Sequence, residues 1–456
     1  MGRCAILVSL VIAGCYAPAP QPGAPCSTQR DCPDPLVCSP QNRCEAAGGA
    51  IDAPIDTGPP PMCGPDEAPC VGGACGAATC LHPGHVATGF GTFVVPTLQS
   101  IVLAEAVLDT RTGAITGARA PNTKPDSYEV IGGIGFVRAT QGNGEPIAIW
   151  VVGSLAITGS VTATGDASVV LASATALTIG ADGVLDLGAR GLVPGPGGQL
   201  GGTFRTAGAG CGGGGAPTGT GTSGDTGSTN GGAGGGGFGT NGGAGGSGVG
   251  GPGAAGNASA CADLLVTTLV GGSGGGGGDT SGTVPGPFGG GGGGALQLTA
   301  MGELTIQGRI TVGGGGGRTA EGNSRDGAGG GSGGTVFLEA PVLTLGPSAG
   351  VFANGGGGGS ASAGAGSACS GPLAEDGKPS LVAAAGSRCA SGFGGNGAAG
   401  DAPASAGQSA NAAGGGGGGL GQIVTRTLPG HEPTIATSNL SPAPTSPAFH
   451  VLPTLD

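Results

Sequence analysis

The chain has 456 residues and a formal net charge of −12, and 113 residues are glycine and 35 are proline. Charged residues make up only 9% of the chain, aromatic residues 3%, and no basic stripe is present. This composition excludes nucleic-acid binding, because both the electrostatic footprint and the stacking residues of such proteins are missing. Glycine and proline at this level usually indicate low complexity. The low charge nevertheless argues against simple charge-driven disorder.

Residues 1–15 have the pattern of a secretory signal peptide, with a positive start and an apolar run, 4–12, too short to span a bilayer. The last four residues, Ile12-Ala13-Gly14-Cys15, resemble the lipobox of bacterial lipoproteins. The resemblance implies that Cys15 becomes the lipidated first residue of the mature chain, held in a membrane by several acyl chains. A plain signal peptide that is cut elsewhere is the alternative. Tyr16 follows the cysteine where Asp could stand, which in lipoprotein families implies export to the outer membrane or cell surface.

Twelve cysteines remain when Cys4 in the signal peptide and Cys15 are set aside from the total of 14. They are Cys26, Cys32, Cys38, Cys44, Cys63, Cys70, Cys75, Cys80, Cys211, Cys261, Cys369 and Cys389. An even number at regular spacing predicts disulfides in an exported protein, although the sequence does not determine their pairing. His82 and His85 make a metal site the alternative near Cys80. Zinc sites prefer closer cysteine pairs with reduced thiols, so we expect no metal and no cofactor.

The N-terminal part divides by composition. A proline-rich tether (16–25), a cysteine-rich module (26–44), a linker (45–62) and a second cysteine-rich segment (63–88) precede the body. The first module, "PCSTQRDCPDPLVCSPQNRC", resembles small modules near the N-termini of myxobacterial surface lipoproteins. That resemblance implies a crosslinked spacer and carries no known activity.

Residues 89–428 form a body with a recurring pattern of short apolar strands. An extended stretch at 98–108 fits helix or strand, a hairpin is expected at 107–115, and Trp150 is expected in the core. Three units of about 25 residues follow, within the range of repeat proteins. Their strands are expected at 169–171, 177–179 and 184–187, then at 296–298, 304–306 and 310–312, then at 336–338, 343–345 and 351–353. A last partial unit is expected at 420–428, and the proline-rich tail (429–456) is expected to be irregular.

Three short strands per unit indicate coils that bury their apolar faces by stacking about 4.8 Å apart. The strand pattern resembles that of right-handed parallel β-helices of the pectin-lyase type, which implies a mainly β solenoid. A β-sandwich with disordered glycine-rich loops is the alternative.

Glycine-rich inserts separate the units at about 195–294, 313–334 and 355–419. Each follows a third strand and precedes a first strand, so the inserts should emerge side by side. Two outcomes are open. Ordering glycine costs more backbone entropy than ordering any other residue, which favours disorder. Packing as bundled polyproline II segments is the other outcome, and glycine-rich regions of some phage tail adhesins and receptor ectodomains resemble it. Crosslinks that join Cys211 to Cys261 and Cys369 to Cys389 would favour ordered inserts.

No catalytic residue is predicted. Matches to G-x-S-x-G at 271–275 and 330–334 are expected by chance among so many glycines. The best candidates for a polysaccharide-cleaving site are Asp166, Asp182, Asp186 and Arg190, but the stacked units place no second carboxylate at the position of Asp186. Solvated turn carboxylates are the simpler interpretation.

Taken together, the chain resembles the glycine-rich surface lipoproteins of myxobacteria. This resemblance implies a lipid-anchored, non-enzymatic surface protein with a structural or adhesive role, whose partners are the membrane and a surface glycan or matrix. A polysaccharide lyase or hydrolase is the alternative. An ice- or crystal-binding face is a third possibility that would need stacked T-x-T rows, and Thr162-Ala163-Thr164 is a single instance.

Overall fold

The computed structural model describes residues 36–38, 44–46, 98–124, 126–217, 231–248, 251–264, 268–279, 286–320, 326–362, 374–389, 392–410, 412–427 and 430–452. The chain divides into two compact units, Met1–Met62 and Cys63–Asp456. In the first unit, β1 (Leu36–Cys38) and β2 (Cys44–Ala46) pair antiparallel. The expected signal peptide, Cys15, the tether and the segment 63–88 lie outside the described residues, as does the linker beyond residue 46.

The second unit is mainly β with parallel sheets, as the sequence predicts. Its strands before the first insert are β3 (Ser100–Asp109), β4 (Glu129–Ile131), β5 (Ile134–Thr140), β6 (Pro146–Val152), β7 (Ser154–Thr164), β8 (Ser168–Ser173), β9 (Ala176–Ile179) and β10 (Val184–Asp186). Those after it are β11 (Ala295–Ala300), β12 (Glu303–Ile306), β13 (Arg309–Thr311), β14 (Thr335–Glu339), β15 (Val342–Leu345), β16 (Gly350–Phe352), β17 (Gln422–Arg426), β18 (Thr434–Ile435), β19 (Leu440–Ser441) and β20 (Phe449–Leu452). A 3-10 helix, η2 (Ala258–Leu264), lies within the first insert.

Equivalent strands of successive units pair in parallel and in register. The first strands, extended at one end by β6, β5 and β4, form the eight-stranded sheet, in the order β20-β17-β14-β11-β8-β6-β5-β4. The pairs β4–β5 and β5–β6 are antiparallel. The second and third strands form the ten-stranded sheet around the long strand β7, in the order β18-β15-β12-β9-β7-β10-β13-β16-β19, with β3 also paired to β7. Leu304 is aligned with Leu177 on one side and Leu343 on the other. The strand positions expected for all three units are therefore confirmed.

One hydrophobic core fills the space between the two sheets. Its members are apolar residues at alternating positions on the strands, and Leu177, Leu304 and Leu296 are fully buried in it. Alternation along each strand places these side chains inward, which is why short strands of three to six residues suffice. We call this two-sheet region the strand body.

The N-terminal end of the core is closed by the segment around β5 and β6. Trp150 is 1% exposed, its ring centroid lies 4.8 Å from that of Phe136, and its Nε1 donates to the carbonyl oxygen of Gly113 at 3.0 Å. Gly113 has a φ of 73°, and a Cβ there would meet the Phe136 ring at 2.2 Å, so this turn requires glycine. The expected core position of Trp150 is confirmed, and the stretch that fitted helix or strand is the strand β3.

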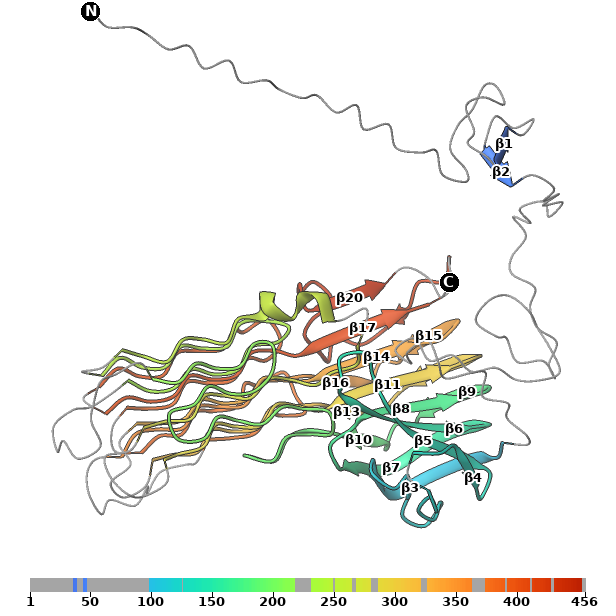
Figure 1. Ribbon diagram of the computed structural model, residues 1–456, viewed down its shortest axis with the longest axis horizontal. Coiled ribbons are helices and arrows are strands. Elements are labelled where there is room, and N and C mark those ends of the chain that lie inside the picture. The colour runs from blue at the N-terminus through green and yellow to red at the C-terminus, as the bar shows by residue number, and fades with distance from the viewer. Residues whose placement is uncertain are drawn as a thin grey trace, which may run out of the picture. The chain divides into compact units, whose positions relative to one another are not determined.

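The described parts of the three inserts pack together and extend from the strand body as segments that lie side by side (Figure 1). We call this region the glycine bundle. Its interior segments, 231–238, 326–334 and 413–421, are buried. Of the two outcomes that the sequence left open, the described residues agree with ordered packing.

Backbone hydrogen bonds run in turn through three segments of the glycine bundle and return to the first segment three residues earlier. The amide of Gly330 donates to Gly416, the amide of Gly416 donates to Ala233, and the amide of Ala233 donates to Gly327, at 2.9, 2.8 and 3.1 Å. Successive donors are three residues apart, since Gly327, Gly330 and Gly333 donate in turn to Ala413, Gly416 and Gly419. A step of three residues is the period of the polyproline II helix, and collagen uses glycine in the same way where three chains meet.

Side chains are excluded from the interior of the glycine bundle by distance. A Cβ on Gly329 would lie 1.9 Å from the carbonyl oxygen of Gly234, and a Cβ on Gly416 would lie 2.0 Å from that of Gly243. Both neighbours are backbone atoms, which cannot move aside as the end of a flexible side chain can.

The tail from residue 429 was expected to be irregular, but the structure shows strands within residues 430–452. Here β18, β19 and β20 pair with β15, β16 and β17 and add a further layer to both sheets. Proline and small polar residues lie between these strands, and the strands themselves have only two to four residues. The expectation was wrong because such short strands are formed by pairing with a preceding layer, which composition does not reveal.

Candidate functional site at the free end of the glycine bundle

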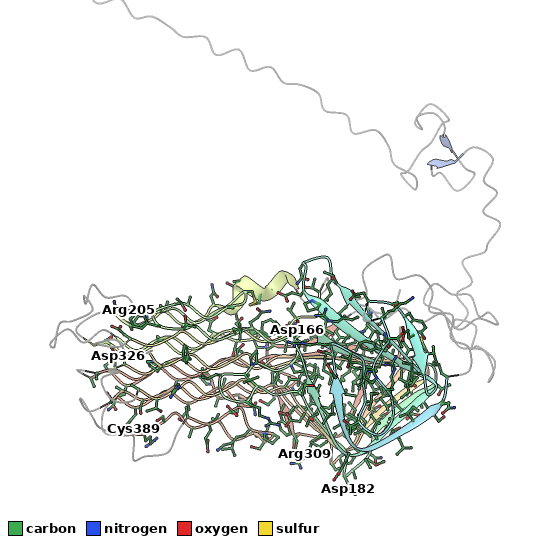
Figure 2. All side chains as sticks on the ribbon, turned by 60° about the horizontal axis from the view of Figure 1, so that its bottom comes forward. Asp166, Asp182, Arg205, Arg309, Asp326 and Cys389 are labelled. Carbon is green, nitrogen blue, oxygen red and sulfur yellow. A yellow bond between two sulfur atoms is a disulfide. The ribbon has the colours of Figure 1, made fainter. Side chains whose placement is uncertain are left out.

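Polar and aromatic side chains gather where the glycine bundle ends, away from the strand body. Figure 2 shows Arg205, Asp326 and Cys389 at this free end. Phe204 and Phe393 are 41% and 37% exposed, and they are the exposed phenylalanines of the described residues. Each has a guanidinium group over its ring, that of Arg205 at 5.4 Å and that of Arg388 at 5.8 Å from the centroid.

The first of these arginines is committed to the bundle itself. Arg205 forms a bidentate ion pair with Asp279, which is 4% exposed, and Asp326 beside it is 1% exposed. The hydrogen bond with Asp279, followed by the negative charges of both aspartates, raises the pKa of Arg205 although burial opposes this. Arg205 also has a φ of 50°, the left-handed region that few side chains adopt. Its role is therefore to neutralise buried carboxylates.

The second arginine is exposed and has no ion pair within the described chain. Arg388 lies over Phe393, and Phe393 is fixed to the neighbouring segment by two hydrogen bonds with Gln408. The amide of Phe393 donates to Oε1 of Gln408 at 3.0 Å, and the amide of Gln408 donates to the carbonyl oxygen of Phe393 at 2.8 Å. Oε1 of Gln408 thus accepts a hydrogen bond, whereas no described residue accepts one from Nε2 of this exposed side chain. We call Arg388, Phe393 and Gln408 the Arg388 site.

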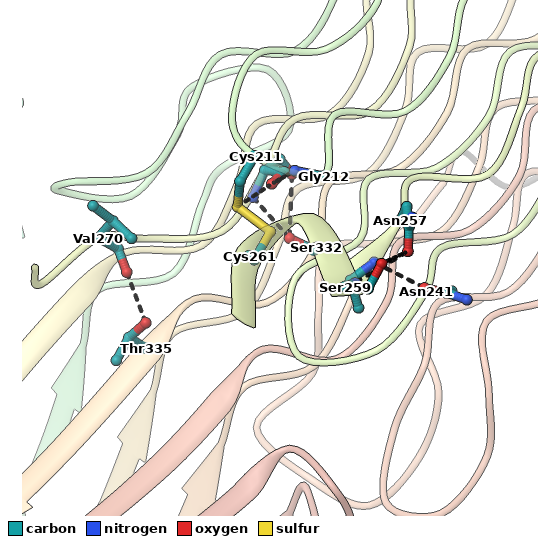
Figure 3. The surroundings of a disulfide bond; sticks show 11 residues. Cys211, Gly212, Asn241, Asn257, Ser259, Cys261, Val270, Ser332 and Thr335 are labelled. Carbon is teal, nitrogen blue, oxygen red and sulfur yellow. Dashed lines mark hydrogen bonds between the residues drawn. A yellow bond between two sulfur atoms is a disulfide. The ribbon is translucent and has the colours of Figure 1, made fainter. Parts of the chain in front are cut away.

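Disulfides tie the outer segments of the glycine bundle. Cys211 and Cys261 are joined, which confirms one expected crosslink, and Figure 3 shows η2 held by it against the segment at Gly212. Beneath it, the hydroxyl oxygen of the buried Ser273 accepts from the amide of Gly212 at 3.1 Å. Cys389 is also disulfide-bonded. Cys38 and Cys44 are aligned on β1 and β2, and the remaining expected disulfide cysteines lie outside the described residues.

The candidate carboxylates for polysaccharide cleavage are not brought together. Asp166 contacts Arg111 and Arg138 at 3.4 and 3.1 Å, while Asp186 pairs with Arg190 four residues on. Asp182 is exposed in the turn before β10, well separated from Asp166 (Figure 2). Burial acts to raise the pKa of Asp166, but its own backbone N–H and the charges of Arg138 and Arg111 lower it overall. An ionised aspartate between two arginines does not act as the proton donor that glycoside cleavage needs.

A buried polar cluster on the eight-stranded sheet was not predicted. Glu339, 1% exposed, pairs with Arg426 and accepts from Thr299 and Gln297 at 2.9 and 3.1 Å. Thr299, Glu339 and Arg426 occupy equivalent positions of successive units, so aligning the units could have revealed the pair. Burial closes this cluster to a ligand, and we assign it a structural role.

Threonines form a single row on the outer face of the ten-stranded sheet. Thr178, Thr305, Thr344 and Thr434 are aligned across β9, β12, β15 and β18. The adjacent row holds Ala176, Glu303 and Val342, so the double row of a T-x-T surface does not form there. The observed row does not support an ice- or crystal-binding face.

Two further searches and the comparisons complete the description. In the described part of the chain, no group of three or more His, Cys, Asp or Glu side chains is arranged to hold a metal ion. None of its helices is long and apolar enough to cross a membrane. No protein-family model, curated protein or solved structure matches the chain.

Proposed function

We propose that this chain is a lipid-anchored, exported surface protein with a non-enzymatic, adhesive role. The lipobox-like residues at Cys15 support the anchor, and the even set of cysteines supports an oxidising compartment. The single observation that supports adhesion best is the glycine bundle. It is an ordered, backbone-bonded support whose free end carries exposed aromatic and cationic groups.

The parallel sheets of the strand body support the right-handed parallel β-helix that we propose from the sequence resemblance. Equivalent strands of each unit stack in parallel, and the chain passes from the eight-stranded sheet to the ten-stranded sheet within each unit. Connections between parallel strands of this kind are right-handed in nearly all proteins. We infer a solenoid that serves as the base of the bundle.

The arrangement favours binding over catalysis. Aromatic and arginine side chains are the groups most often responsible for affinity at recognition surfaces. The candidate carboxylates are instead held by arginines or lie apart, as described above. A polysaccharide lyase or hydrolase therefore remains the less supported alternative.

Two measurements on the full chain in producing cells test the proposal. Labelled palmitate should be incorporated into the wild-type protein, and a Cys15→Ala variant should lose the label and leave the membrane fraction. Cells without the protein should adhere less to one another or to their matrix, and wild-type complementation should restore adhesion where Cys15→Ala does not. Membrane retention that is independent of Cys15, or release of sugar fragments when the purified chain is incubated with acidic polysaccharides, would count against it.

A further inference from the structure

The Arg388 site combines three features that together define a ligand chemistry. The Phe393 side chain is 37% exposed, and the guanidinium of Arg388 lies over its ring, 5.8 Å from the centroid. The exposed side chain of Gln408 is fixed by the bond from the amide of Phe393 to its Oε1, and no described residue accepts a hydrogen bond from its Nε2. A flat apolar face next to a cation and a neutral donor matches a sugar ring that bears a carboxylate and hydroxyls.

The two phenylalanine–arginine pairs at the free end serve as an internal comparison. Arg205 is neutralised by Asp279, so its charge stabilises the protein. Arg388 is exposed and forms no ion pair with the described residues, in a chain whose net charge is −12. A positive group left unpaired on an acidic protein is available to an anionic partner.

The segments beneath the site make it rigid. Phe393 and Gln408 lie on neighbouring segments that also exchange backbone bonds with the bundle interior, since Gly394 donates to Ser387 and Gly395 to Gly415, at 2.9 and 2.8 Å. The disulfide at Cys389 restrains the residue next to Arg388. Little side-chain and backbone freedom is then lost on binding, which favours affinity from a small contact.

We propose that the Arg388 site binds an acidic polysaccharide of the uronic-acid class. The carboxylate pairs with the Arg388 guanidinium, the sugar ring lies against Phe393, and a hydroxyl accepts from Nε2 of Gln408. This inference rests on the adhesive function proposed above and specifies its ligand.

A binding measurement with immobilised polygalacturonate tests the proposal. It uses the full chain, made soluble by Cys15→Ala. Fully methyl-esterified polygalacturonate serves as the neutral probe. The acidic form should bind more tightly, and added salt should weaken its binding. Arg388→Gln should reduce affinity about tenfold, as expected for loss of one charge-assisted hydrogen-bonded pair. Arg388→Lys should retain part of the affinity, because it keeps the charge and loses the planar guanidinium.

Arg309→Gln is the matched control, since Arg309 is an exposed arginine of β13 on the strand body whose guanidinium makes no cation–π contact with a described ring. It should bind as the wild type does. Equal binding of the acidic and esterified probes, unchanged binding by Arg388→Gln, or no binding of the acidic probe overturns the ligand assignment. If Arg388→Gln cells still adhere as the wild type does, the adhesive function stands and the Arg388 site is not its basis.

Discussion

The strand body and the glycine bundle are ordered by opposite means. In the strand body, apolar side chains such as Leu177 and Leu304 meet between two sheets, and their burial supplies the stability. In the interior of the bundle there are almost no side chains to bury. At most interior positions the residue is glycine, so the segments approach closely enough for amide–carbonyl bonds between their backbones.

The two regions therefore place different requirements on the amino-acid sequence. The strand body depends on which side chain is present at each inward position. The bundle depends on the absence of side chains at interior positions, and its individual hydrogen bonds each contribute only about 0.5–1.5 kcal/mol net. Substitutions in the two regions should therefore fail for different reasons, and this can be measured.

The largest effect is expected in the strand body from Leu304→Ala. Leu304 is fully buried at the centre of the stacked strands, so its truncation should cost about 2–5 kcal/mol of unfolding free energy through lost burial and a cavity. Thr305→Ala, on the outer face of the same strand, is the control and should change stability by less than about 1 kcal/mol. Denaturant unfolding measures both. Similar losses for the two variants would show that the strand does not alternate as described.

Removal of the disulfide should act on the bundle and spare the strand body. The Cys211–Cys261 crosslink spans 50 residues. The double variant Cys211→Ser, Cys261→Ser should therefore lose about 2–4 kcal/mol of unfolding free energy. Hydrogen exchange should show faster exchange at glycine amides between the two cysteines and unchanged protection at Leu304. Faster exchange throughout both regions would instead mean that they unfold as one cooperative unit.

A single added methyl group tests the interior of the bundle. Gly329→Ala places a Cβ against the carbonyl oxygen of Gly234, and we expect a cost of about 1–3 kcal/mol by overpacking. Gly142→Ala, in the open turn between β5 and β6, has no atom within 4 Å of its Cβ and should be tolerated. Thermal unfolding compares the two variants. Equal stability of both would contradict the close packing of the glycine segments.

The smallest effect concerns the last layer of the strand body and depends on pH. Burial lowers the pKa of His450 on β20, so the unfolded chain takes up a proton at higher pH than the folded chain does. Stability should therefore be full above about pH 6.5 and fall as the pH drops from there through the folded pKa. His450→Gln should remove that part of the dependence of stability on pH. If the substitution leaves the dependence of stability on pH unchanged, groups other than His450 cause that dependence.

Prediction from sequence succeeded where side chains carry the information. The alternation of apolar residues located every strand of the three units and the core position of Trp150. The insert boundaries followed directly, because glycine runs begin where alternation ends. The pairing of Cys211 with Cys261 was suggested by their place within one insert.

Prediction failed where partners are distant and no side chain records them. The triad of Gly330, Gly416 and Ala233 joins three segments from different inserts, and glycine runs give no register. The sequence could not predict whether the glycine-rich inserts are ordered, because the entropy cost of fixing glycine and the gain from hydrogen bonds are nearly equal. The Arg388 site was missed for the same reason, since the backbone bond from the amide of Gln408 to the carbonyl oxygen of Phe393 joins two segments whose register glycine runs do not reveal.

The step of three residues between successive donors also determines how the bundle can vary in length. Inserting three glycines at the free end of every segment would leave the existing bonds in register and add a further set, since the register repeats every three residues. Each such insertion would extend the free end by about 9 Å, three times the rise of a polyproline II helix. The length of the glycine bundle is therefore adjustable in fixed increments, independently of the strand body.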